Sequence, residues 1–322
     1  AMLYKGGSVV YRYVVKRLLF LIPTILGVTL IIYAVMSITP GDPGRAMLGT
    51  SALQADVDAY NEMLGYNLPF PIKYFNYVKA MVIDQDFGFS YLTKQPVFDE
   101  IWPRFLETLK LAFLGVFIAA AVGIPFGIYA AVKQYSLWDT IPSLVAFFMA
   151  AFPAFVLGLL FLYYFSLKLN LLPSYGIGSF EHYIMPALAI SIPPAAQNMR
   201  FMKSSMLEAI RQDYVRTARA KGAAERTVVW KHALRNALLP VVTQIGLSLG
   251  ILIAGAVVAE KIFSITGIGS LIVDRIAYKD EPVIIAGTIL ISICFTLVML
   301  LVDIIYAFID PRIRAKYSNT KG

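Results

Sequence analysis

Charged residues are scarce in this sequence. Asp, Glu, Lys and Arg make up only 15% of its 322 residues, whereas 58% are apolar and the mean hydropathy is +0.69. A soluble domain of similar length has about 25% charged residues. The deficit argues against a soluble protein and indicates a chain that is embedded in a membrane.

Residues that build chemical sites are equally rare. The single cysteine, Cys294, excludes an internal disulfide bond and a thiolate metal cluster. The two histidines, His182 and His232, lie too far apart in the sequence to suggest a metal site. No G-x-x-x-x-G-K-[ST] phosphate loop and no H-E-x-x-H pair is present, since Gly267–Ser270 has neither the lysine nor the spacing of a phosphate loop. We therefore predict a non-catalytic chain that itself binds no ATP, metal or other cofactor.

Long uncharged runs are abundant instead. A helix needs about 20 mostly apolar residues to cross a bilayer, and six runs approach or exceed this length. They are Leu18–Ile38, Leu111–Val132, Ile141–Leu167, Tyr183–Met199, Leu238–Ala259 and Val283–Ile309. The first is too long for a signal-peptide core, which has about 7–15 residues, so we interpret it as a retained span. The fourth contains three prolines, which are tolerated where neighbouring helices or a water-lined cavity satisfy the backbone.

The distribution of Lys and Arg predicts the orientation, because short cytoplasmic loops are enriched in these residues. With the N-terminus inside, 18 of the 28 fall on the cytoplasmic side, nine of them between Arg200 and Arg235. Without the fourth run, this basic segment and the basic C-terminal tail would both face the side opposite the basic N-terminus. We therefore predict an all-α membrane protein with six transmembrane helices and both termini inside.

These predicted spans divide the chain into five regions. They are a cytoplasmic N-terminus (1–17), a first span (18–38), a long extracytoplasmic loop region (39–104), a five-helix core (105–310) with a cytoplasmic loop (200–240), and a cytoplasmic tail (311–322).

The basic loop has a helix–glycine–helix pattern. From Arg200 to Lys221 the periodicity predicts one helix, and Gly222 suits the left-handed position that ends it. Residues 224–234 are predicted to form a second short helix. The apolar face of the first helix is predicted to consist of Met202, Met206, Ile210 and Tyr214.

Alanines surround this glycine, so another protein could approach the backbone closely, and we favour a docking role. The charge by itself also fits a solvated loop that only sets topology, and a glycine turn between basic helices also fits a DNA-binding helix-turn-helix. Spans on both sides argue against nucleic acid. In the fifth run, Gly246, Gly250 and Gly255 predict close helix packing.

The segment EAIRQDYVRTARAKGAAERTVVWKHALRNALLP (208–240) resembles the cytoplasmic loop of ABC-importer permeases of the dipeptide, oligopeptide and nickel subfamily. Three further regions agree with it, so the resemblance covers nearly the whole chain. They are TPGDP at 39–43, LGYNLPFPIKYFNYVK with DQDFGFS at 64–79 and 84–90, and DPRIR at 310–314. The stretch from Asp84 to Gly88 departs from the family, which more often has a Gly before the Asp.

The resemblance implies a type I ABC-importer permease fold and a short coupling helix that sits in a cleft of a cytoplasmic ATPase subunit. The residues to which it assigns this role are Ala218, Lys221, Gly222, Ala223, Glu225 and Arg226. It also implies the partners: a homologous second permease chain in a heterodimer, two ATPase subunits that hold ATP and Mg, and an extracytoplasmic substrate-binding protein. The resemblance further implies that the chain is a multi-pass protein of the bacterial plasma membrane, surrounded by lipid.

The leading hypothesis is therefore the permease subunit of an ATP-driven peptide importer. A nickel or metal-chelate importer is the alternative, although the few histidines and the single cysteine favour peptides. A third hypothesis, an ion-driven secondary transporter, rests on Asp303 inside the last uncharged run. The sequence leaves open the peptide length and the residues that line the pathway.

Overall fold

The computed structural model describes residues 2–309, so the motif at 310–314 and the tail at 311–322 lie outside the described residues. Within that range the regular elements are all helices, joined by turns and loops, and Phe89 and Pro96 form an isolated antiparallel bridge. The chain forms two compact units, each of which combines segments that are distant in sequence. Unit one contains residues 2–15, 109–265 and 297–309, and unit two contains residues 16–108 and 266–296.

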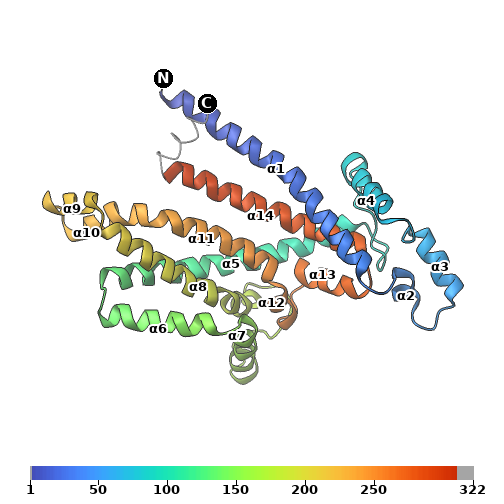
Figure 1. The fold of residues 1–322 in the computed structure, drawn as a ribbon. Coiled ribbons are helices and arrows are strands. Elements are labelled where there is room, and N and C mark those ends of the chain that lie inside the picture. Colours follow the sequence, from blue (N-terminus) through green and yellow to red (C-terminus); the bar gives the residue numbers. More distant parts are fainter. Residues whose placement is uncertain (1, 310–322) are drawn as a thin grey trace. The chain divides into compact units, whose positions relative to one another are not determined.

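Unit one is built around α8 (Glu181–Ile210), which lies beside α6 and α11 (Figure 1). Its other elements are most of α5 (Val97–Val132), α6 (Leu137–Ala151), α7 (Ala154–Phe161), the π-helical η2 (Leu162–Lys168), α9 (Asp213–Ala220), α10 (Glu225–Thr227), the π-helical η3 (Val228–Ala233), α11 (Leu234–Gly255) and α12 (Val257–Ile262).

Glycines allow the helices of unit one to pack backbone against backbone. A Cβ atom on Gly123 of α5 would lie 2.5 Å from the carbonyl oxygen of Ala195, and one on Gly127 would lie 2.6 Å from that of Met199. Any side chain at these positions would push α5 away from α8. Gly246 of α11 lies close to α14 (Glu281–Ile309), since a Cβ atom there would clash with the side chain of Val302, which confirms the close packing predicted for it.

Unit two contains the segment predicted as an extracytoplasmic loop, and this segment is folded. Its elements are most of α1 (Met2–Ile38), α2 (Pro43–Leu48), α3 (Gln54–Met63), α4 (Phe70–Lys79), the π-helical η1 (Ala80–Asp84), the start of α5, α13 (Ile268–Ala277) and the start of α14 (Glu281–Ile309). Asp42 caps α2 by accepting a hydrogen bond from the Arg45 N–H at 2.6 Å. In the same unit, the Lys279 ammonium donates to the Met36 carbonyl at the end of α1, at 3.0 Å.

Four helical stretches are long and apolar enough to cross a membrane: Val14–Ile38, Val97–Val132, Glu225–Ala254 and Glu281–Ile305. They confirm the first, second, fifth and sixth predicted spans as apolar helices, with shifted ends.

The third predicted span, Ile141–Leu167, is not one continuous helix. It is broken between α6 and α7, whose axes differ by 95°, so it is a broken span or a re-entrant segment. The break follows from Pro153, because a proline disfavours the helical conformation of the residue before it, and Phe152 is extended with φ −79° and ψ 124°.

The fourth predicted span, Tyr183–Met199, lies within α8, which keeps all three prolines inside one helix of 30 residues. Among the described residues, α8 is not one of the helices that are apolar enough by composition alone to span a membrane. Its crossing of the bilayer, and hence the count of six spans, stays a prediction.

Candidate functional site

The basic loop ends α9 with a tight turn at Gly222. This glycine has φ +78°, the left-handed conformation that the sequence predicted. The Gly222 N–H donates to the Arg219 carbonyl at 2.9 Å, and the Ala223 N–H donates to the Ala218 carbonyl at 3.2 Å. This pair of hydrogen bonds is a Schellman motif, which satisfies the last carbonyls of the helix and fixes the direction in which the chain leaves it.

An ion pair closes the turn on its outer side. Nε of Arg219 donates to Oε2 of Glu225 at 3.1 Å, and Nη2 donates to Oε1 at 2.6 Å. Hydrogen bonding to this carboxylate raises the pKa of Arg219 above its usual value. Planar two-point pairing of this kind holds a fixed geometry better than a single contact. It therefore ties the end of α9 to the first residue of α10. Arg219 was missed by sequence reasoning, although its basic side chain precedes the glycine and an acid follows it.

The six residues predicted to dock a partner all lie in this turn, which we call the coupling turn (residues 218–226). Lys221, Gly222, Glu225 and Arg226 are exposed, whereas Ala218 and Ala223 are half-buried and pack inward. The structure therefore brings all six together, but only four of them offer open surface. Their docking role stays a prediction.

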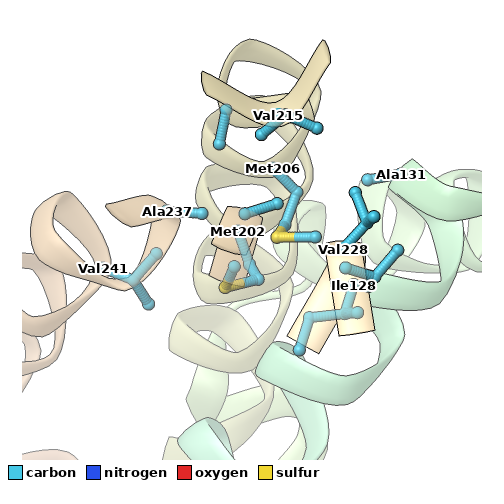
Figure 2. Close-up of a cluster of buried hydrophobic side chains, with 11 residues drawn as sticks. Ile128, Ala131, Met202, Met206, Val215, Val228, Ala237 and Val241 are labelled. Atoms are coloured by element: carbon cyan, nitrogen blue, oxygen red, sulfur yellow. The ribbon is translucent and has the colours of Figure 1, made fainter. Parts of the chain in front are cut away.

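Beneath the coupling turn, a cluster of buried apolar side chains joins it to the long helices of unit one. Met202 and Met206 of α8 are fully buried, and Figure 2 shows them among side chains contributed by α5, α9, η3 and α11. Val215 of α9 and Val228 of η3 are both 0% exposed and flank the coupling turn on its two sides. Protein cores of this kind are packed as tightly as organic crystals, so the cluster holds the coupling turn firmly against α8 and α11.

The predicted helix from Arg200 to Lys221 is wrong in one respect. α8 ends at Ile210, and α9 begins at Asp213 after a short turn. This break moves the buried position of α9 by one residue, so Val215 is buried and Tyr214 is 40% exposed. Tyr214 was predicted to continue the apolar face because the periodicity of a single helix was extended across the break.

The predicted second helix, residues 224–234, is also not separate. α10, η3 and α11 form one helical stretch from Glu225 to Ala254. The coupling turn is therefore attached directly to a membrane-spanning helix, without a flexible linker on that side.

One motif in α11 has the spacing of a catalytic serine without its structural context. Gly246-Leu247-Ser248-Leu249-Gly250 matches G-x-S-x-G, which marks a nucleophile only at a sharp strand-to-helix turn. Ser248 lies inside α11, and its hydroxyl donates to the Gln244 carbonyl one turn earlier at 2.9 Å. This serine is a helix-packing residue. Among residues 2–309, three or more metal-ligating side chains do not come together at any point.

Known protein families and relatives match nearly the entire chain. Residues 123–315 match the family described as binding-protein-dependent transport system inner membrane component, and residues 10–112 match the N-terminal membrane component of such systems. The chain is 41% identical over 305 residues to the glutathione transport system permease protein GsiC of Escherichia coli strain K12 and of Salmonella typhi. Each alignment covers 95% of this chain and 99% of the relative.

Two solved structures share the fold. An inward-facing form of the methionine ABC transporter MetNI superimposes with a TM-score of 0.56 and 19% identity, over 66% of this chain and 96% of that chain. An amino acid ABC transporter solved with histidines has a TM-score of 0.50 and 15% identity, over 64% of this chain and 92% of that chain.

Proposed function

Because this chain belongs to the family of binding-protein-dependent transport system inner membrane components, it is a non-catalytic permease subunit of an ATP-driven importer, and we propose that it imports short peptides. We propose further that its coupling turn docks on the ATPase partner. ABC importers work with ATPase subunits, which bind the ATP, and with a substrate-binding protein. The chain itself is a multi-pass protein of the bacterial inner membrane.

The assignment to peptides is supported by the relatives that import glutathione, a tripeptide, at 41% identity over nearly their whole length. The solved importers of free amino acids are more distant, and their likeness ends at the fold. The chemistry of the chain also favours a peptide over a bare metal ion, since its sequence has only two histidines and one cysteine to ligate a metal.

The observation that carries the docking proposal is a rigid, exposed, mainly basic turn mounted on a buried apolar cluster. The Schellman hydrogen bonds and the Arg219–Glu225 pair fix its shape, while Lys221 and Arg226 face outward. A loop that only set membrane topology would need the positive charge but neither the fixed shape nor the buried support. Electrostatic complementarity would suit an acidic cleft on the partner.

This arrangement also suggests how ATP hydrolysis could drive transport. When two ATPase subunits close on ATP and Mg, each would move the coupling turn that it holds. Val215 and Val228 would pass that movement to α8 and α11 through the buried cluster, and the permease would switch between two discrete arrangements. A homologous second permease chain, in a heterodimer with this one, would complete the pathway, and the binding protein would deliver the peptide from outside.

A substitution at Gly222 tests the docking proposal. A Cβ atom there would meet open space, but the φ of +78° strains a β-branched residue by about 1–2 kcal/mol. We expect Gly222→Val to abolish peptide-dependent ATP hydrolysis and uptake by the assembled importer in proteoliposomes. Gly222→Asn is the matched control, since asparagine has similar bulk and tolerates the left-handed conformation, and it should retain most activity. Full coupled uptake by the valine variant would refute the docking role.

The same vesicles test the cargo independently. With the cognate binding protein and ATP, the unaltered importer should accumulate radiolabelled glutathione or dipeptides, and excess nickel chelate or free methionine should not compete. Uptake of nickel chelate in preference to peptides would contradict the peptide assignment while leaving the docking proposal intact.

A further inference from the structure

We propose that α4 and η1 (Phe70–Asp84) lie within the lipid bilayer, where their outward face contacts phospholipid acyl chains. This segment belongs to the region predicted as an extracytoplasmic loop, for which immersion in the surrounding solution is the simplest expectation. The inference rests on the membrane location of the chain and is independent of its cargo and of the coupling turn.

A hydrogen bond to α1 sets the depth of α4. The Tyr74 hydroxyl donates to the Leu26 carbonyl at 2.9 Å. Leu26 lies twelve residues before Ile38, the last residue of the spanning helix, which corresponds to about 18 Å at 1.5 Å per residue. Because the hydrocarbon core is about 30 Å thick, this hydroxyl lies near the middle of the membrane.

An ion pair with α14 limits how far α4 can lie from the middle of the membrane. Lys73, the residue next to Tyr74, has its ammonium 3.4 Å from the Glu281 carboxylate. Glu281 is the first residue of α14 and therefore marks the end of that span on the loop side. The backbone of α4 is thus held between the level of Glu281 and the level of Leu26, inside the leaflet on that side.

The inner face of this segment packs against the two spanning helices. The ring of Tyr33 on α1 lies 6.0 Å from that of Tyr74 and 5.4 Å from that of Tyr77, between centroids. Ile285 and Ile289 of α14 are buried in the same cluster. These contacts hold α4 beside the spanning helices α1 and α14, and not beyond their ends.

The outward face is mainly apolar. Ile72, Phe75, Val82 and Ile83 are 47%, 66%, 63% and 68% exposed, and their spacing places them on one side of the helix. The same side also carries the exposed Asn76 and Lys79, so this face is mainly but not wholly apolar. At the same depth, the spanning helix α1 also exposes apolar side chains, those of Ile31 and Val35. The acyl chains that cover these side chains of α1 would therefore also cover the outward face of α4.

Two further features distinguish this segment. At 15 residues it is too short to cross the bilayer, which suits a re-entrant or interfacial helix. Within residues 70–84, the exposed charged side chains are Lys79 and Asp84, and the four-carbon stem of a lysine can lie along apolar surface while its ammonium extends away from it. The neighbouring α3 has the opposite character, since its exposed side chains include Asp56, Asp58 and Glu62, which require water.

Spin-label accessibility tests this proposal. In a Cys294→Ser background, single cysteines would replace Phe75, Val82 or Ile83 and carry a nitroxide, with the full importer reconstituted in phospholipid vesicles. Ile31→Cys on α1 is the lipid-facing reference, and Asp58→Cys on α3 is the water-facing reference. The side chains replaced by cysteine are all exposed, so these substitutions should not disturb packing.

We expect the labels at Phe75, Val82 and Ile83 to collide with oxygen and not with a water-soluble nickel chelate, as at Ile31. Collision with the nickel chelate at the level found for Asp58 would overturn the proposal, because the face would then lie in water. Shielding from both reagents would also overturn it, because another protein chain would then cover this face.

Discussion

Lys203 on α8 and Asp139 on α6 form an ion pair that joins these two helices near the start of the basic loop. The Lys203 ammonium also donates to the Ser143 hydroxyl at 3.1 Å, and the carboxylate accepts from the Tyr135 N–H at 3.1 Å. The Asp139 side chain is only 10% exposed, so its charge depends on these partners. A buried carboxylate that loses its cation keeps the cost of desolvation without the compensating attraction.

We therefore expect Lys203→Met to destabilise the protein by about 2 kcal/mol, less than the loss of a fully buried pair because Lys203 retains some access to solvent. The double variant Lys203→Met with Asp139→Asn should recover much of this loss, since no charge is left unpaired. Thermal unfolding of both variants in the same detergent measures the difference. Equal stability of the single and double variants would show that the two side chains are not coupled.

At the scale of an element, α9 depends on its neighbours for its position. A helix of eight residues is too short to be stable alone in water, so tertiary contacts must supply the stability. Val215 is the residue of α9 that is buried completely, and it packs with Met206 and Val228. The element that carries the coupling turn is thus attached to the core mainly through one side chain.

Val215→Asp should release α9 from the core, because a carboxylate at a fully buried position would be unpaired. We expect faster tryptic cleavage at the exposed Arg216 and Arg219 and loss of peptide-stimulated ATP hydrolysis. Tyr214→Asp is the matched control, since it places the same charge on the adjacent, exposed residue and should leave both measurements unchanged. An equal effect of the two substitutions would contradict the observed register of α9.

At the scale of the whole molecule, unit two combines parts of the chain that are far apart in sequence. Asp280, which precedes α14, accepts hydrogen bonds from the Ser90 hydroxyl at 2.5 Å and from the Tyr91 N–H at 2.9 Å. Its carboxylate also lies 3.6 Å from Nε of Arg275, whose guanidinium contacts Glu100 at the start of α5. This buried polar group therefore holds the loop before α5 against the segment between α13 and α14.

We expect Asp280→Ala to destabilise unit two strongly, by about 3–5 kcal/mol, because Asp280 is fully buried and its partners would be left unsatisfied. Ser90→Ala removes one of these hydrogen bonds and should cost about 1 kcal/mol. Amide hydrogen exchange of residues 90–97 would report both changes. Asp56→Ala, at an exposed position of α3 in the same unit, is the control and should leave the exchange unaltered; protection that survives Asp280→Ala would refute this role.

Several features could be predicted from the sequence because their causes are local. Uncharged runs of about 20 residues predict spanning helices whatever surrounds them, and four of the six predicted runs match such helices. Gly222 predicts a left-handed helix end because only the absence of a Cβ atom makes that conformation easy. The resemblance carried by residues 208–240 likewise depends on the order of residues alone, and the family match confirms it.

Other features were decided by packing between segments that the sequence does not bring together. Pro153 was visible as a helix breaker, but the 95° angle between α6 and α7 depends on what each helix packs against. The burial of Val215 in place of Tyr214 depends on where α8 ends against its neighbours. The pairing of Asp280 with Ser90 joins positions 190 residues apart. Short-range rules follow from backbone geometry and hydropathy, whereas the choice of partner for each buried side chain exists only once the whole chain has folded.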